Sequence, residues 1–146
     1  MVAKFTLMIL MVAVLGCEAE PSSKYEWKTI RVTATAYNST HHQTEGDPFV
    51  GAFGDSLKPG MKCIAVSRDL YRLGLRNNTF VTIDGLKGIY IVKDKMHERW
   101  KNKIDIYMGT DIIAARRWGR KKVNIHYRVK AEDYERSLFE SKKLIK

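Results

Sequence analysis

The sequence contains few cysteines, few prolines and no repeated or low-complexity segment. Two of its 146 residues are cysteine and three are proline. Two cysteines cannot form the dense disulfide framework of a small secreted scaffold. An apolar content of 45% is ordinary for a folded protein and argues against a disordered one. Because no internal period is visible, a solenoid is excluded as well. At this length the chain has room for a single domain.

The sequence also lacks an apolar run long enough to span a bilayer as a mature helix. Its longest run, residues 5–15, follows Lys4 and is shorter than the about 20 residues that a spanning helix needs. A short apolar core behind a basic residue is typical of an export signal. Residues 14–17, Val-Leu-Gly-Cys, resemble a bacterial lipobox. This pattern predicts a signal peptide at residues 1–16 and a lipid on Cys17; a plain signal peptide beside a chance cysteine is the alternative.

Acidic residues are in the minority, with 16 Asp and Glu against 26 Lys and Arg, which gives a net charge of +10. The leader predicts an exported protein of the bacterial cell envelope, anchored to the membrane by its lipid and facing the periplasm or the cell wall. There, a basic protein has anionic envelope polymers as its natural partner. Nucleic acid is the generic alternative, but export argues against it, as does the lack of an aromatic stacking pattern among the basic residues.

Short alternating segments rich in β-branched residues predict the strands. They occupy residues 30–37, 63–66, 80–83, 90–92, 103–107 and 123–129. Thr110 or Asp111 can cap a helix that runs to Trp118, and Gly119 supplies its stop. A charged helix is expected after residue 130. We therefore predict a mainly β fold, a small six-stranded barrel with one short helix and a C-terminal helix.

The segments between these elements define the domain organisation. Residues 17–28 are polar and without periodicity, which indicates a tether, so the barrel domain is placed at residues 29–129 and a helical tail at 130–146. Residues 38–59 form a long stretch without its own secondary-structure pattern, and such loops in compact domains are usually functional. Cys63, at a strand start, is expected to be a buried core residue without a disulfide partner.

One aspartate interrupts an apolar strand. Asp105 stands between Ile104 and Ile106, whereas Asp94 follows the preceding strand. Because alternate residues of a strand point to opposite faces, Asp105 must point away from the two isoleucines, toward solvent, a partner or a groove. A solvated face or a turn-capping carboxylate is the simpler interpretation of this pattern.

Six fragments in a fixed order resemble the three-aspartate (3D) domain. This double-psi β-barrel family includes membrane-bound lytic transglycosylases of the A type and stationary-phase survival proteins, and the resemblance covers residues 32–127. The matching fragments are Ala34-Thr35-Ala36-Tyr37, Ile64-Ala65-Val66, Leu73-Gly74, Lys93-Asp94, Lys103-Ile104-Asp105-Ile106-Tyr107 and Trp118-Gly119. The resemblance implies a six-stranded double-psi barrel in which Asp94 and Asp105 converge on one groove.

The resemblance also implies a reaction. Asp105 matches the catalytic aspartate and Asp94 the second one, while Ser67 stands where the family has its first aspartate. Asp69, two residues later, is a candidate substitute in substrate binding. Cleavage between muramic acid and glucosamine occurs without water: one carboxylic acid protonates the glycosidic oxygen and its carboxylate then takes the proton of the 6-hydroxyl, which closes a 1,6-anhydro ring. Such an acid needs a raised pKa, from burial or from Asp94.

Further side chains are candidates for holding the glycan. Tyr37 and Thr44 resemble residues that line the groove in this family, although Tyr37 is equally explained as a core aromatic. Trp100, Lys101 and His97 can contact a sugar or belong to an ordinary loop. Neighbouring histidines at 41 and 42 have no spaced third ligand, so we expect no metal, and we expect no cofactor.

Three interpretations follow. The first is a peptidoglycan lytic transglycosylase, favoured by retention of both Asp94 and Asp105. The second is a non-catalytic, expansin-like peptidoglycan-binding lipoprotein, favoured by Ser67 and by Lys95-Met96-His97 where the family has Thr-Gly-Gly. The third is a structural lipoprotein that uses its barrel as an interaction platform. In each case a monomer is expected.

Overall fold

The computed structural model describes residues 24–39 and 49–143. The leader, Cys17, Thr44 and the histidine pair at 41 and 42 lie outside the described residues. No helix within the described ranges is both long and apolar enough to cross a membrane.

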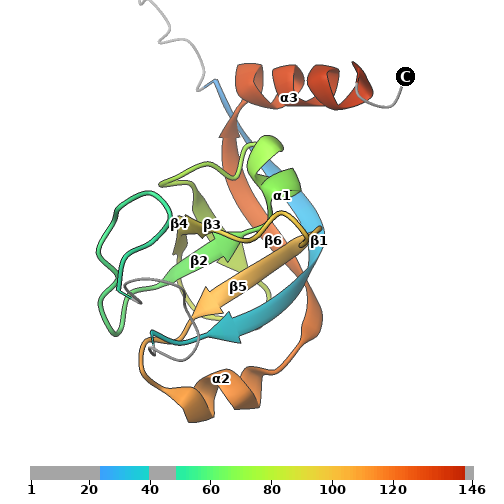
Figure 1. The fold of residues 1–146 in the computed structure, drawn as a ribbon. Helices are drawn as coiled ribbons and strands as arrows, with labels where there is room; N and C mark the ends of the chain where they lie inside the picture. The colour runs from blue at the N-terminus through green and yellow to red at the C-terminus, as the bar shows by residue number, and fades with distance from the viewer. Residues whose placement is uncertain (1–23, 40–48, 144–146) are drawn as a thin grey trace, which may run out of the picture.

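Six strands form a closed barrel in the described part of the chain, and the fold is mainly β, as predicted (Figure 1). Around the barrel the strand order is β1-β5-β2-β4-β3-β6, which is consistent with a double-psi barrel. The strands are β1 (Tyr25–Tyr37), β2 (Cys63–Val66), β3 (Phe80–Ile83), β4 (Tyr90–Lys95), β5 (Lys103–Tyr107) and β6 (Lys121–Lys130). The ranges of β2, β3 and β5 are those expected from the sequence, because each is a β-branched run between turn-forming residues.

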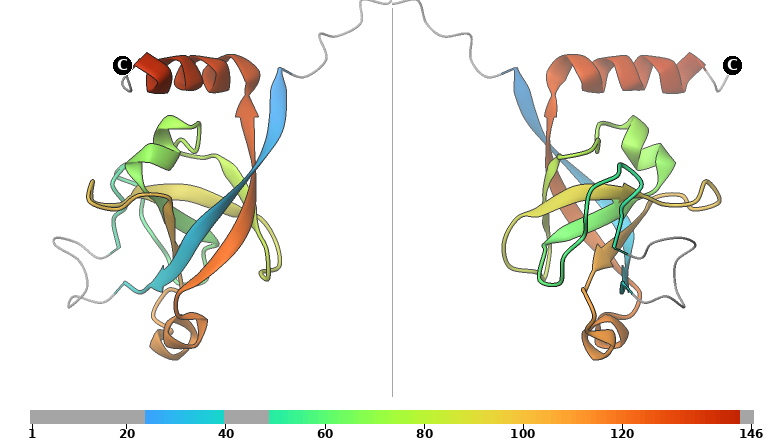
Figure 2. Two further views of the ribbon diagram at one scale, coloured as in Figure 1. Left: turned by 90° about the vertical axis from the view of Figure 1, so that its right-hand side faces the viewer. Right: turned by 60° about the vertical axis from the view of Figure 1, so that its left-hand side comes forward.

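β1 and β6 form a long antiparallel ribbon that reaches beyond the barrel (Figure 2). β1 begins at Tyr25, so residues 25–28 of the expected tether belong to this strand. The pairing of Tyr25 with Lys130 holds them there through backbone hydrogen bonds. The C-terminal helix α3 (Ala131–Lys143) lies across the tip of the ribbon, and the Lys28 ammonium is 4.1 Å from the centroid of its Tyr134 ring.

The barrel interior is filled by branched aliphatic side chains from every strand. Ile104 and Ile106 of β5 are fully buried, and so are Ile64 and Val66 of β2. In β6 burial alternates along the strand, with Ile125 inside and Asn124 outside. This two-residue period fixes which face of each strand is available for a site.

Two short helices lie on opposite sides of the barrel (Figure 1). In α2 (Ile112–Trp118) the Asp111 carboxylate accepts a hydrogen bond from the Ala114 amide (2.8 Å), and Gly119 follows with a φ of 67°. Both ends were predicted. The helix α1 (Arg68–Arg72) was not predicted, because five residues are too few for an amphipathic period.

Candidate functional site

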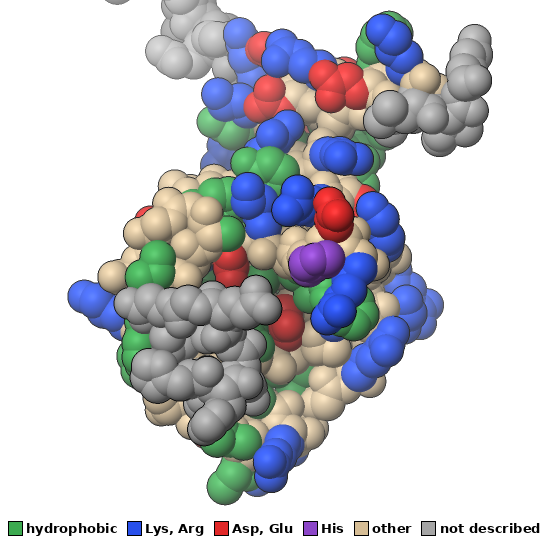
Figure 3. Space-filling model, viewed as in Figure 1, with side chains coloured by type: hydrophobic (Ala, Val, Ile, Leu, Met, Phe, Trp, Pro, Cys, Tyr) green, Lys and Arg blue, Asp and Glu red, His purple; other side chains and the backbone are tan. Residues whose placement is uncertain are grey.

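A pocket opens where β2, β4 and β5 lie side by side, and its volume is about 200 Å³. Figure 3 shows acidic side chains recessed in a hollow of this face, with basic side chains and a histidine on part of its rim. The pocket is lined by Tyr37, Ala65, Asp94, Lys95, Met96, His97, Trp100 and Asp105. The two aspartates thus share one pocket, as expected.

Strand register explains why the aspartates meet. Ala65 of β2 pairs with Asp105 of β5 on one side and with Asp94 of β4 on the other, while Thr35 of β1 pairs with Asp105. Residues paired across strands point to the same face. Neighbouring strands are about 4.8 Å apart, so the two aspartate Cα atoms are about 10 Å apart with the small Ala65 between them.

An irregularity in β4 brings Asp94 into this row. Ile64 pairs with Val92, but the next residue, Ala65, pairs with Asp94, so Lys93 is passed over. Such a bulge re-aims the side chains that follow it. A regular register would instead place Lys93 opposite Ala65, and the pocket would contain one aspartate.

Asp105 is a half-buried carboxyl with one fixed oxygen. The Thr35 hydroxyl donates a 2.8 Å hydrogen bond to its Oδ1, and no described residue bonds its Oδ2. Burial raises the pKa of Asp105 above its ordinary value, while the Thr35 hydrogen bond and the Lys103 charge oppose that rise. The negative charge of Asp94 raises the pKa a little further. Asp105 therefore holds its proton more tightly than an exposed aspartate does.

Asp94 differs from Asp105 in its hydrogen bonds. Its Oδ1 accepts from the backbone amides of Ala52 (2.7 Å) and Lys95 (2.8 Å), and these bonds partly offset the burial that raises its pKa. Asp94 consequently ties the loop before β2 to the edge of the pocket. Gly51 is required in that loop, because a Cβ there would overlap the Lys93 carbonyl oxygen.

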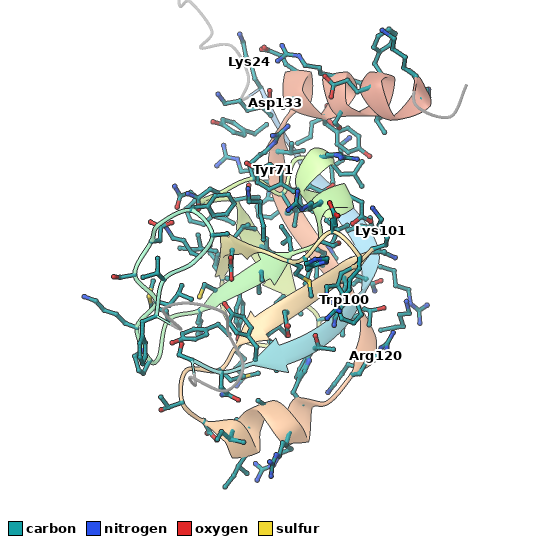
Figure 4. All side chains as sticks on the ribbon, viewed as in Figure 1. Lys24, Tyr71, Trp100, Lys101, Arg120 and Asp133 are labelled. Atoms are coloured by element: carbon teal, nitrogen blue, oxygen red, sulfur yellow. The ribbon has the colours of Figure 1, made fainter. Side chains whose placement is uncertain are left out.

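Three further pocket residues come from the end of β1 and from the connection between β4 and β5. Tyr37 ends β1, and its hydroxyl has no hydrogen-bond partner among the described residues. Burial raises its pKa. Trp100 lies on the connection between β4 and β5 (Figure 4), with the Lys103 ammonium 3.8 Å from its ring centroid. His97 accepts a hydrogen bond at Nδ1 from the Arg99 amide (3.2 Å).

Other candidates lie elsewhere. Asp69 is on α1 and does not line the pocket: its Oδ2 accepts a hydrogen bond from the Asn102 amide (2.8 Å), which fixes the start of β5. Lys101 neighbours Trp100 in the chain but is exposed and outside the pocket lining (Figure 4). Ser67 is fully buried, and its hydroxyl accepts from the Lys103 amide (3.1 Å). It cannot replace an aspartate in the pocket.

Among the described residues, no three His, Cys, Asp or Glu side chains come together in a way that could hold a metal ion.

Cys63 is a free, buried thiol packed beside Leu57 and Tyr107. Burial, with the nearby Asp94 charge, raises its pKa to about 12, so the thiol stays protonated and unreactive.

Comparison with known proteins finds a likeness of fold only. No protein-family model matches the chain, and no curated protein matches it. Among solved structures, the chain is similar to the Clavibacter michiganensis expansin, both in its apo form and as a mutant in complex with cellohexaose. Identities are 22% and 21%, and the TM-score is 0.43 in each case. Each match covers 68% of this chain and 49% of the expansin, so this chain spans about half the expansin's length.

Proposed function

We propose that this protein binds the glycan strands of peptidoglycan in the pocket around Asp94 and Asp105. The observation that carries the proposal is the combination of two half-buried carboxyl groups and the indole of Trp100 in one pocket. Sugars present hydroxyl donors at their edges and C–H groups on their faces. Carboxylates accept from the hydroxyls, and the face of an aromatic ring packs against the C–H groups.

Peptidoglycan is favoured over other glycans for two reasons. The ordered fragments that resemble the 3D domain include both pocket aspartates and Tyr37, and members of that family act on this polymer. The chain also carries a leader typical of export and a net charge of +10, which suits an anionic wall.

A second candidate function, cleavage, is favoured by the state of Asp105. One of its oxygens is held by Thr35, the other makes no hydrogen bond to a described residue, and burial raises its pKa. In this candidate, Asp105 protonates the glycosidic oxygen between muramic acid and glucosamine. The carboxylate then takes the proton of the muramic acid 6-hydroxyl while that oxygen bonds to C1, so the acid is regenerated and no water is consumed.

Purified sacculi test both candidates in one experiment. The mature protein is expected to sediment with sacculi, and a double variant, Asp94→Asn with Trp100→Ala, is expected to remain largely in the supernatant. A matched Asp84→Asn with Trp27→Ala variant, changed outside the pocket, should sediment like the wild type. Wild-type protein that stays in the supernatant, or that binds cello-oligosaccharides and not sacculi, contradicts the peptidoglycan proposal.

Mass spectrometry of the soluble fraction then separates binding from cleavage. Only the intramolecular route gives 1,6-anhydro-muropeptides. Their accumulation with time supports the second candidate, whereas sedimentation without any such product restricts the protein to binding.

We also propose that the protein acts as an envelope lipoprotein anchored through Cys17. The support is the Val-Leu-Gly-Cys sequence directly after an apolar segment. Cys17→Ser is expected to block lipidation and release the protein from the membrane fraction. Unchanged fractionation of that variant contradicts the anchor.

A further inference from the structure

Lys95 occupies an unusual place at the edge of the pocket. Its ammonium lies 5.1 Å from the centroid of Phe53 and 5.5 Å from that of Tyr71. The two rings are stacked, with centroids 5.8 Å apart and planes inclined by 23°. Phe53 belongs to the loop before β2. Tyr71 lies on α1 (Figure 4) and Lys95 ends β4, so three separate segments of the chain build this arrangement.

No carboxylate in the described part of the chain neutralises this ammonium. Among residues 24–39 and 49–143, Lys95 forms no ion pair. Its chain neighbour Asp94 bonds the Lys95 backbone amide and not the ammonium. The rings attract the cation through their negative faces, but they leave its hydrogen-bond donors free. Lys95 is therefore an exposed, pre-positioned cation that lines the same pocket as the two aspartates.

A second cation continues the row away from the pocket. The Arg76 guanidinium carbon lies 4.7 Å from the centroid of the Tyr71 ring. Arg76 in turn lines a cavity of about 280 Å³ beneath α3, which also contains Arg128 and Lys130. Positive charge thus extends from the edge of the pocket along an aromatic surface. Such a surface suits the binding of a polymer that carries repeated negative charges.

We propose that Phe53, Tyr71 and Lys95 form a subsite for a carboxylate carried by the bound glycan, so that Lys95 selects acidic glycans over neutral ones. The proposal rests on the proposed function, since Lys95 lines the same pocket and Phe53 and Tyr71 adjoin it through Lys95. The pocket floor is itself acidic, and it suits a part of the ligand that donates hydrogen bonds. The Lys95 edge suits an anionic substituent beside that part. In a peptidoglycan strand whose stem peptides have been removed, the lactyl carboxylate of muramic acid is such a substituent.

A purely internal role for Lys95 is the alternative. Its charge lowers the pKa of Asp94, so a variant could alter the pocket without any contact to the ligand. The two roles differ in one measurable property. Direct contact makes the effect of Lys95 depend on the charge of the ligand, whereas an internal role makes the effect the same for acidic and neutral ligands.

Calorimetric titration with two forms of one glycan tests the subsite. Strands stripped of stem peptides by an amidase expose the lactyl carboxylates, and carbodiimide coupling to methylamine neutralises the same strands. The wild-type protein is expected to bind the acidic strands about threefold to fivefold more tightly at low salt, with the difference shrinking as salt rises. Lys95→Met is expected to abolish the difference by weakening only the acidic complex. If the wild type releases anhydro products, all variants are measured with Asp105→Asn.

Two controls accompany the test. Lys95→Arg keeps the cation and should retain the preference, and Lys87→Met removes one exposed charge on the β3–β4 turn and should leave both affinities unchanged. Binding of both strand forms with equal affinity by the wild type overturns the subsite but leaves the proposed function standing. An equal loss for both forms in Lys95→Met overturns direct contact. No binding of either form contradicts the proposed function itself, and the subsite with it.

Discussion

In the cleavage candidate, Asp105→Asn is expected to lower the rate of 1,6-anhydro-muropeptide release from sacculi by about 10²- to 10⁴-fold, the usual contribution of a positioned acid–base group. The amide keeps an Oδ1 that can accept from Thr35 but carries no proton that it can give to the glycosidic oxygen. Asp94→Asn should have a smaller effect, because Asp94 bonds two backbone amides and acts on Asp105 only through its charge. Asp84→Asn, outside the pocket, should have no effect. Timed digests analysed by mass spectrometry give the rates.

Stability as a function of pH shows whether the Asp105→Asn barrel is intact. Because burial raises the pKa of Asp105, the folded protein holds this proton more tightly than the unfolded chain does. The resulting stability is fully present below the unfolded pKa of about 3.9 and is lost as pH rises through the higher folded value. Asn does not ionise, so the variant should be at least as stable as the wild type at neutral pH. The difference in unfolding free energy between the two should disappear near pH 4, because Asp105 is then protonated in the wild type as well. A variant that is clearly less stable at pH 7 contradicts the role given to burial.

Trp100→Ala is expected to weaken binding to glycan strands by about thirtyfold, an effect typical of a central aromatic contact. The substitution removes the largest ring that lines the pocket. The barrel should remain folded, because Trp100 is on a connection between strands and its contacts with Lys103 and Arg99 are cation–π contacts at the surface.

Trp27→Ala is the matched control for this loss. Trp27 is on β1 and is 62% exposed, and it does not line the pocket. Trp100→Phe should recover most of the affinity because it retains an aromatic face. Equal affinities of wild type and Trp100→Ala, measured by calorimetry, would exclude a role for this ring in glycan binding.

Much of the barrel could be predicted from local pattern alone. The strands containing Ile64, Val81 and Ile104 are short runs of β-branched residues between turns, and their ends agree with the structure. The start of β1 could not be predicted, since Tyr25 and its neighbours are polar or exposed and are held in place by pairing with β6. Local propensity does not report such long-range pairing.

The candidate site was predictable only in part. The alternation around Asp105 placed its carboxyl opposite the buried isoleucines, and the structure has it there. The convergence of Asp94 with Asp105 followed from a family resemblance and depends on a bulge that the sequence of β4 does not reveal. The placement of Asp69 on α1, bonded to the Asn102 amide, separates it from the pocket. Spacing alone does not tell which face of a short helix an aspartate occupies.

The most direct test of a glycan site in this pocket uses the indole N–H signals of the three tryptophans. Trp100 lines the pocket, Trp27 is on the ribbon, and Trp118 ends α2 with its indole nitrogen buried. Isotope-labelled protein is titrated with amidase-stripped peptidoglycan strands and followed by nuclear magnetic resonance. The Trp100 signal is expected to shift with saturation while those of Trp27 and Trp118 stay in place. A shift of the Trp27 or Trp118 signal with Trp100 unmoved contradicts a glycan site in the Asp94–Asp105 pocket.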